Sequence, residues 1–548
     1  MKRKKKIAST IVMTTVMSTM VMACSTPAPA PANNTKTPAT TPAPATGTAT
    51  TYPMKTDKTL TYWMELTGNL TGVKSSHADT PFFQEWQKKT GVPLKFIAPP
   101  TNQAKEALNV MLASGDLPDM IEFNFFKDFP GGPEKAIKDG YILKLNDLID
   151  KNAPNLKKYL KDHPDIDKMV KTDNGSYYSF PFIRGDDLLM VYQGPIVRQD
   201  WLDELGLPLP QTIDDWTAML KAFKEKKGAT APFTASSKPR VFNEFNSGHF
   251  MGAYGVTRDF YREDGTIKFG PAEKGYKEWL ALFRGWYEQG LLDKNIATVD
   301  TKAFDANIAS GASGATVANT GGGIGKWQPL LTEKDPKAKL VAAPQPVLKK
   351  GDTPKFGQRD LPFSINGGMV AVTATSKNAE LAVKLLDYGY SEEGNKYFNF
   401  GTEGVSYKME NGVPKYTDLL MKNPDKLAPA QTLSMYTRAN YSGPFVQDKG
   451  YITQYLALQS QKDALPIWSK TDMAKYQMPP VTPTPEESSE FAKIMTDVNT
   501  LVDEMTLKII LGAEPLDSFE KYVDKLKSVK IDRAIEIQKA ALDRYNKR

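Results

Sequence analysis

The sequence is poor in the residues that form disulfides and transition-metal sites. It contains one cysteine, Cys24, and three histidines, His77, His163 and His249, among 548 residues. A single cysteine excludes an internal disulfide and a thiolate-based metal cluster. The three histidines are scattered along the chain, and an isolated histidine is more often structural than a metal ligand. We therefore expect no metal site and no cofactor.

The sequence also lacks a strong excess of charge once its first segment is set aside. The formal net charge is +7, and the basic run at residues 2–6 supplies five of those positive charges. Removing that run lowers the charge to +2. Elsewhere lysines are interspersed with Asp and Glu, as on an ordinary solvated surface, whereas nucleic-acid-binding proteins gather Lys and Arg on one face. We expect no nucleic-acid partner.

Residues 1–23 have the pattern of a lipoprotein signal peptide. After the basic run comes an uncharged, moderately apolar stretch from Ile7 to Met22, diluted by Ser and Thr. This stretch is shorter than the roughly 20 apolar residues that a membrane span needs, which disfavours the alternative of a transmembrane anchor. The sequence VMAC at Val21–Cys24 then resembles a lipobox, with Met22 a less usual residue at its place. We expect Cys24 to be lipidated.

Residues 24–56 are predicted to be a tether behind the lipid. After Cys24, the stretch Ser25–Thr56 consists almost entirely of Pro, Ala and Thr. Such a composition cannot bury enough apolar surface to offset the entropy of ordering the chain, and its prolines make it semi-stiff. One acyl chain would bind a membrane weakly, so stable anchoring needs more than one. We expect a lipid-anchored protein on the extracellular face of a cell membrane.

The folded part is predicted to begin with alternating short strands and helices. Apolar, β-leaning runs at 60–63, 92–97 and 120–123 are separated by two helical segments. Thr80-Pro81 provides an N-cap and a proline at the first helical position, and Gly91 and Gly115 are suited to end the two helices. This order predicts a parallel sheet with crossover helices, whose ligand lies beyond the carboxyl ends of the strands.

Three blocks of the sequence resemble family 1 extracellular solute-binding proteins of ABC importers. They are ASGDLPDMIEF at 113–123, VRQDWLDELGLPLPQTIDDW at 197–216 and NFGTEGVSY at 399–407. The resemblance covers Asp57–Arg548 and is similar to the lipoprotein subgroup that includes alginate- and pectin-oligosaccharide-binding proteins. It implies a two-lobe α/β fold of the periplasmic-binding-protein type II class, with a ligand cleft between discontinuous lobes and a helical C-terminus. The expected lobes are 57–183 with 357–440, and 184–356 with 441–548.

Many members of the alginate-binding subgroup carry a calcium loop with regularly spaced Asp and Asn after the position that corresponds to Phe223. Here the chain reads KEKKGA at Lys224–Ala229. Calcium needs six to eight oxygen ligands, and this segment supplies almost none. We expect no structural calcium there.

The residues expected to bind the ligand follow strand ends and lobe crossings in both lobes. They are Trp63, Glu65, Asn124, Phe125, Arg184, Asn246, Asn319, Trp327, Arg438 and Trp468. Aromatic rings can stack on the C–H faces of a pyranose, while Asn, Glu and Arg can pair with its hydroxyls. Trp468 lies in a polar stretch that is predicted to be a loop, which would expose its ring. Arg184 and Arg438 would permit a uronate.

The resemblance implies a monomeric receptor that captures an oligosaccharide for import through ABC permease subunits, without catalysis. A secreted glycosidase or lyase is an alternative, since paired carboxylates could perform that chemistry. However, the pairs Asp186-Asp187 and Glu486-Glu487 are adjacent in sequence, and adjacent side chains rarely face one ligand. Glu486-Glu487 also follows Thr484-Pro485, which together predict a helix start. A chemosensory or adhesive lipoprotein on the same scaffold is a further alternative.

Overall fold

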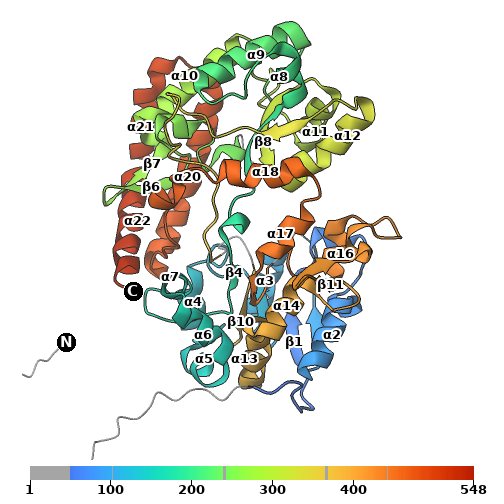
Figure 1. Cartoon of the computed structure of the whole chain (residues 1–548). Coiled ribbons are helices and arrows are strands. Elements are labelled where there is room, and N and C mark those ends of the chain that lie inside the picture. The colour runs from blue at the N-terminus through green and yellow to red at the C-terminus, as the bar shows by residue number, and fades with distance from the viewer. Residues whose placement is uncertain (1–49, 102, 238–241, 364–367, 441) are drawn as a thin grey trace, which may run out of the picture. The chain divides into compact units, whose positions relative to one another are not determined.

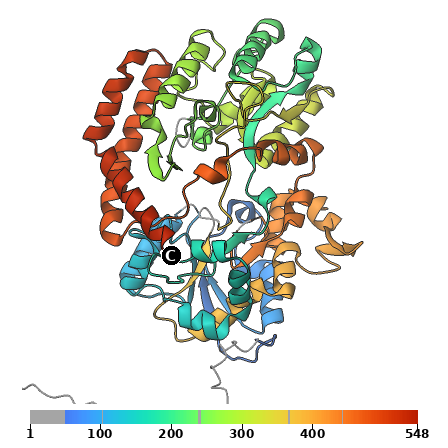
Figure 2. The same ribbon diagram turned by 60° about the vertical axis from the view of Figure 1, so that its left-hand side comes forward.

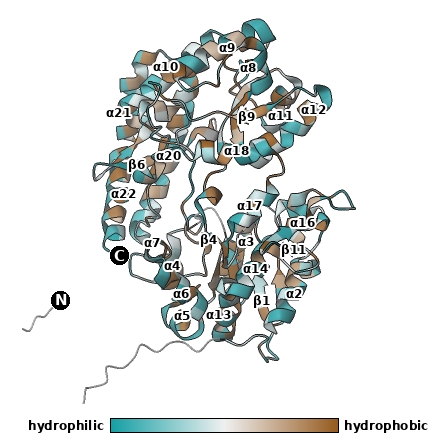
Figure 3. Cartoon of the chain, viewed as in Figure 1, coloured by the Kyte–Doolittle hydropathy of each residue, from teal (hydrophilic) through white to brown (hydrophobic). Residues whose placement is uncertain are grey.

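The computed structural model describes residues 50–101, 103–237, 242–363, 368–440 and 442–548. The expected signal peptide, Cys24 and most of the tether lie outside these residues. The described residues form one compact unit, and its helices and strands gather around two large hydrophobic cores, one in each lobe (Figure 1). Colouring by hydropathy shows apolar residues concentrated on the strands and the inner helix faces (Figure 3). In the described part of the chain, no helix combines the length and apolar character needed to cross a membrane.

The first lobe contains a four-stranded sheet with the order β10-β3-β1-β2. Strand β1 (Leu60–Trp63) pairs in parallel with β2 (Leu94–Ile97) and with β3 (Met120–Phe123), which confirms the predicted parallel arrangement. Strand β10 (Met369–Val372) pairs antiparallel with β3. Because β10 comes some 250 residues after β3, this lobe is discontinuous in sequence.

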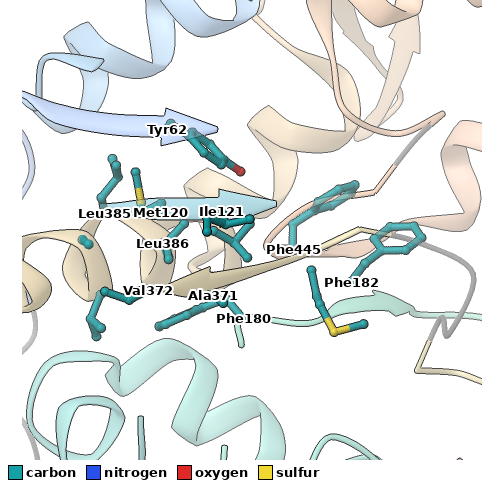
Figure 4. Packing of buried hydrophobic residues seen from close by; sticks show 14 of the residues in the cluster. Tyr62, Met120, Ile121, Phe180, Phe182, Ala371, Val372, Leu385, Leu386 and Phe445 are labelled. Carbon is teal, nitrogen blue, oxygen red and sulfur yellow. The ribbon is translucent and has the colours of Figure 1, made fainter. Parts of the chain in front are cut away.

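The helices of the first lobe begin and end where local signals predict. Thr80 Oγ1 accepts a hydrogen bond from the Phe83 amide at the start of α2, and Gly91 ends that helix with a φ of 75°. In Figure 4, Leu385 and Leu386 of α13 pack with Met120 among the buried side chains around the sheet. The main helices of this lobe are α2 (Pro81–Thr90), α3 (Ala104–Ser114), α4 (Gly132–Lys138), α5 (Asn146–Asn152), α6 (Pro154–Asp162), α7 (Pro164–Met169), α13 (Ala379–Asp387), α14 (Glu392–Phe400), α16 (Pro429–Tyr436) and α17 (Lys449–Tyr455).

The second lobe is built on a three-stranded antiparallel sheet with the order β8-β5-β9. Strand β5 (Gln193–Arg198) lies between β8 (Ala315–Asn319) and β9 (Leu340–Ala342). The helices around it include α8 (Gln199–Leu205), α9 (Ile213–Lys227), α10 (Lys274–Glu288), α11 (Thr301–Ser310), α12 (Lys326–Lys334), α18 (Gln459–Trp468), α20 (Pro485–Ile510), α21 (Phe519–Ser528) and α22 (Ile531–Asn546). The predicted helix start at Thr484 is confirmed, because Thr484 and Glu487 form a reciprocal capping box.

Segments that are distant in sequence meet where the chain passes between the lobes. Strand β4 (Phe182–Arg184) pairs in parallel with β13 (Phe445–Gln447). Phe445 was expected in the second lobe, but its side chain belongs to the first core. The last passage between the lobes therefore comes after α17, which lies on the first lobe, and before α18, which lies on the second (Figure 1).

The C-terminal helices also connect the two lobes. Figures 1 and 2 both show α20 and α22 running from the second core down to the first lobe, where α22 ends near α7. Arg544 Nε donates to Asp173 Oδ2 over 2.7 Å, and Arg548 Nη2 donates to Asp173 Oδ1 over 2.6 Å. Asp173 lies in the turn that follows α7, so these ion pairs join the end of α22 to the first lobe.

Candidate functional site

A cavity of about 360 Å³ lies where elements of both lobes meet, and we take it as the candidate site. A larger hollow of about 730 Å³ is lined by first-lobe residues such as Lys89, Tyr388 and Lys396, so the second lobe does not enclose it. The residues that line the interlobe cavity are Arg184, Leu188, Leu189, Val191, Tyr192, Asn319, Thr320, Gly321, Gly322, Asn440, Gln447, Tyr451, Ile452 and Tyr455.

Two of the predicted ligand-binding residues, Arg184 and Asn319, line this cavity. Arg184 is the last residue of β4, and Asn319 is the last residue of β8. Arg184 lies where the chain passes between the lobes, and Asn319 lies in the second lobe, while Tyr451 and Tyr455 reach the cavity from the first lobe. Asn319 is exposed and is followed by a π-helical turn, Thr320–Gly325, whose first two glycines also line the cavity.

The guanidinium of Arg184 is paired with a carboxylate inside the protein. Its Nη2 donates to Asp360 Oδ2 over 2.8 Å, and its Nη1 donates to the carbonyl oxygen of Leu189 over 3.0 Å. Gln358 Nε2 donates to the other carboxylate oxygen of Asp360 over 3.3 Å. Burial raises the pKa of Asp360, and the positive charge of Arg184 opposes this rise.

Two aromatic residues of α17 that the sequence analysis did not select lie at the cavity. The rings of Tyr451 and Tyr455 are stacked, with centroids 5.5 Å apart and an interplanar angle of 20°. A Cβ atom on Gly321 would lie 3.6 Å from the hydroxyl oxygen of Tyr455, so this ring reaches the glycine turn of the second lobe. The sequence pattern that could have identified Tyr451 and Tyr455 is their spacing of four residues, which places two side chains on one face of a helix.

The prediction that Trp468 is exposed in a loop is wrong. Trp468 ends helix α18, its side chain is fully buried, and its indole Nε1 donates to the carbonyl oxygens of Pro195 and Ala343 over 3.2 and 3.1 Å. The polar residues and Pro466 in this stretch suggested a loop, but the helix accommodates that proline. A ring enclosed in this way cannot stack on a ligand.

Trp327 is likewise part of the second lobe's interior. Its side chain is 1% exposed, its Nε1 donates to Asp305 Oδ1 over 2.8 Å, and its ring meets the edge of Phe304. Phe125 and Trp63 are buried in the first core. These three aromatic rings pack against other side chains in the lobe interiors and therefore do not line the candidate site.

The remaining predicted residues lie away from the cavity. Arg438 donates to Glu122 Oε1 over 2.5 Å, with both side chains less than 10% exposed. Asn124 Oδ1 accepts from the Lys127 amide and so stabilises the turn after β3. The carbonyl oxygen of Glu65 lies 3.1 Å from His77 Nε2.

Asn246, the last of the predicted residues, also lies outside the cavity lining. Its Nδ2 donates to Asn243 Oδ1 within a short helical turn of the second lobe.

The segment after Phe223 is a helix end. Helix α9 continues to Lys227 and ends at Gly228, which has a φ of 67°. Lys224 Nζ donates to the carbonyl oxygen of Gln289 over 2.5 Å. Over the residues that the structure describes, no cluster of three or more His, Cys, Asp or Glu side chains is placed to hold a metal ion.

The two sequence pairs of carboxylates have structural partners. Asp186 Oδ1 accepts from the Leu188 amide, and Asp187 pairs with Arg359 over 2.8 Å. Glu487 caps α20 and also pairs with Arg544. Glu486 Oε1 lies 3.8 Å from Lys138 Nζ, so each of the four carboxylates on which the glycosidase alternative rested has a partner in the protein.

Comparisons with known protein families and with individual proteins identify the same kind of protein. The family described as "Bacterial extracellular solute-binding protein" matches residues 74–396, more than half of the chain. Lipoprotein LipO of Bacillus subtilis (strain 168) is 25% identical over 384 residues, which cover 68% of this chain and 73% of LipO. The fructooligosaccharide ABC transporter substrate-binding protein FusA of Streptococcus pneumoniae is 27% identical over 367 residues, which cover 65% of each protein and thus less than two thirds of FusA.

Solved structures share the fold over most of the chain. The alginate-binding protein AlgQ2 without calcium ion is 27% identical, with a TM-score of 0.69, covering 89% of this chain and 99% of that one. A solute-binding protein from Bifidobacterium longum infantis, described as binding HMO, gives a TM-score of 0.71 at 18% identity, covering 89% and 99% of the two chains, and shows the fold alone. The predicted two-lobe fold is confirmed.

Proposed function

Since the chain belongs to the family of bacterial extracellular solute-binding proteins, we propose that it captures an oligosaccharide between its lobes for import through ABC permease subunits. The observation that carries this proposal is the cavity between the lobes, where polar side chains and tyrosine rings from both lobes meet. The names of relatives support a carbohydrate ligand, because FusA is described as binding fructooligosaccharides and AlgQ2 as binding alginate.

The proposed binding residues combine two chemical roles. Tyr455, which is partly exposed, supplies aromatic surface for the C–H face of a sugar ring, with the buried Tyr451 stacked against it, and Asn319 and Asn440 supply amides for its hydroxyls. Arg184 lines the same cavity. We assign residues 57–183 and 357–455 to the first lobe and the rest of the folded chain to the second, with the last boundary moved from 440 because Phe445 belongs to the first core.

The proposed location is the extracellular face of a cell membrane, through lipid on Cys24. The basic run, the apolar stretch and the lipobox-like VMAC support it, as does the description of LipO as a lipoprotein. The proposed form is a monomer that binds its ligand without altering it. No described carboxylate pair faces the cavity, which favours capture over hydrolysis.

The test is calorimetry of the Cys24→Ser chain against a panel of oligosaccharides, with chromatography of the ligand afterwards. Replacing Tyr455 by Ala should cost about 1–3 kcal/mol of binding free energy, the usual value of burying a large apolar side chain. Tyr287→Ala, on helix α10 of the second lobe, is the matched control and should bind like the parent chain. Tight binding of a peptide and of no glycan would overturn the carbohydrate assignment, and breakdown of the glycan would favour an enzyme.

A further inference from the structure

We propose, building on the function proposed above, that the interlobe site selects uncharged oligosaccharides and discriminates against uronates. The cavity lining contains several polar side chains, but among its described residues only Arg184 carries a full charge at neutral pH. The choice between neutral and acidic sugars therefore depends on whether the positive charge of Arg184 is available to a ligand carboxylate.

The contacts of Arg184 balance that charge within the protein. Its two terminal nitrogens donate to Asp360, to the Leu189 carbonyl and, over a longer 3.4 Å, to Gln447 Oε1. The side chains of Arg184 and Asp360 are only 17% and 10% exposed. Bidentate recognition of a carboxylate requires two parallel N–H groups of a guanidinium. Here Nη1 serves two protein oxygens and one N–H of Nη2 serves Asp360, while the Nε–H, which has no partner among the described residues, is buried away from the cavity surface.

Asp360 is itself held in place, so it cannot easily give way to a ligand. Gln358 Nε2 donates both to Asp360 Oδ1 and to the carbonyl oxygen of Met190, while Gln358 Oε1 accepts from the Tyr192 amide over 2.8 Å. A uronate that approached Arg184 would place a second negative charge beside Asp360 at a partly buried position. Like charges at short range in such a place oppose binding.

The second arginine that the sequence suggested for a uronate offers no alternative. Arg438 is paired with Glu122, and its Nε and Nη2 also donate to the carbonyl oxygen of Ser442. It does not line the cavity. The positive charge of Arg184 is thus balanced by Asp360, and that of Arg438 by Glu122.

Asn440 places a second restriction on where the carboxylate of an acidic sugar can lie. Its Nδ2 donates to the Ala430 carbonyl and to Ser434 Oγ, which fixes the orientation of the amide. Its Oδ1 is buried and has no hydrogen-bond partner among the described residues. A carboxylate placed beside this oxygen would leave it without a donor, whereas a sugar hydroxyl would supply one, so Asn440 opposes any binding pose in which an acid group faces it.

The experiment compares neutral and acidic glycans of equal length on the Cys24→Ser chain by calorimetry. Kestose, raffinose and a galactose trisaccharide form the neutral set, and trigalacturonate and an alginate trisaccharide form the acidic set. We expect the best neutral glycan to bind at least tenfold more tightly than either acidic one. An acidic glycan that binds as tightly as the neutral set would overturn the inference and leave the proposed function intact. Absence of binding to every glycan would overturn both.

Asp360→Asn tests the cause of the selectivity. This substitution keeps the shape of the side chain and releases the charge of Arg184, so the ratio of neutral to acidic affinity should fall about tenfold. Asp187→Asn is the matched control, because Asp187 is paired with Arg359 but is 78% exposed and lies outside the cavity lining. It should leave the ratio unchanged. An Asp360→Asn protein that folds with the parental ratio would contradict the assigned role of the pair, and the parental panel remains decisive if this variant does not fold.

Discussion

The indole ring of Trp468 lies directly against Gly194. A Cβ atom on Gly194 would lie 2.5 Å from the indole Cδ1, closer than any side chain could fit. The same ring donates a hydrogen bond to the carbonyl oxygen of the next residue, Pro195. Helix α18 is thereby fixed to the central strand of the second sheet, which gives Trp468 a packing role.

Replacing Trp468 by Ala should therefore affect stability. Loss of a fully buried tryptophan costs about 3–5 kcal/mol through lost burial and the cavity that remains. Chemical unfolding monitored by circular dichroism measures this change. Trp468→Phe, which retains part of the ring area, should lose less. Loss of glycan binding by the Ala variant without any loss of stability would contradict the buried role.

His249 should make stability depend on pH. Its ring is fully buried, and burial lowers its pKa from 6.5 to about 4. The unfolded chain therefore takes up this proton more readily than the folded chain, so stability present above pH 6.5 is lost as the pH falls towards 4. The contribution has an upper bound of about 3 kcal/mol, since one pKa unit corresponds to about 1.4 kcal/mol.

Unfolding midpoints of the parent and His249→Gln near neutral pH and near pH 4.5 measure this contribution. The variant should lose less stability on acidification. Burial raises the pKa of Asp387 to about 6, so Asp387 makes stability increase as the pH falls, which opposes the effect of His249. The contribution of His249 is therefore read from the difference between the parent and His249→Gln and not from the pH dependence of the parent alone. His163→Gln serves as the control. Identical pH dependence in parent and His249→Gln would show that the imidazole is not the responsible group.

Arg548→Ala should loosen the connection between α22 and the first lobe. The side chain of Arg548 is 3% exposed and donates to Asp173 and to the carbonyl oxygens of Lys168 and Lys171. Loss of these charge-assisted hydrogen bonds should cost about 2 kcal/mol. Hydrogen exchange should rise in the turn around Asp173, while Lys547→Ala, an exposed neighbour, should behave as the parent. Unchanged exchange in this turn would exclude the connection.

Metabolic labelling with a fatty acid tests the expected lipid anchor. The parent chain should be labelled and should sediment with membranes, whereas Cys24→Ser should not be labelled, because the thiol is the only one in the chain. Equal labelling of both proteins would refute the assignment of Cys24.

The first sheet could be predicted because its signals are local. Thr80, Gly91 and Gly115 act on the backbone within a few residues, and the structure has the helix boundaries where these residues indicate. Trp468 could not be placed in the same way, since the residues that bury it, Gly194 and Pro195, are more than 270 positions away in the sequence.

The same difference explains the outcome at the candidate site. Arg184 and Asn319 were selected from expected strand ends and lobe crossings, which are local features of the sequence, and in the structure each ends a strand. The carboxylate that balances Arg184 is 176 residues away, so the sequence alone suggested a free positive charge and a possible uronate. The spacing of Tyr451 and Tyr455 predicts that both lie on one helix face. Where that helix, α17, lies in the protein depends on the pairing of β13 with β4, which the local sequence does not indicate.

The ion pairs of Arg544 and Arg548 with Asp173 also restrict how the lobes can move. Two lobes connected at one place can rotate about many axes through that connection. A second, separate connection leaves only the axis that passes through both. A rotation of the lobes that keeps both the β4–β13 pairing and these ion pairs intact has its axis through those two places. A rotation of the lobes about that axis has a single degree of freedom.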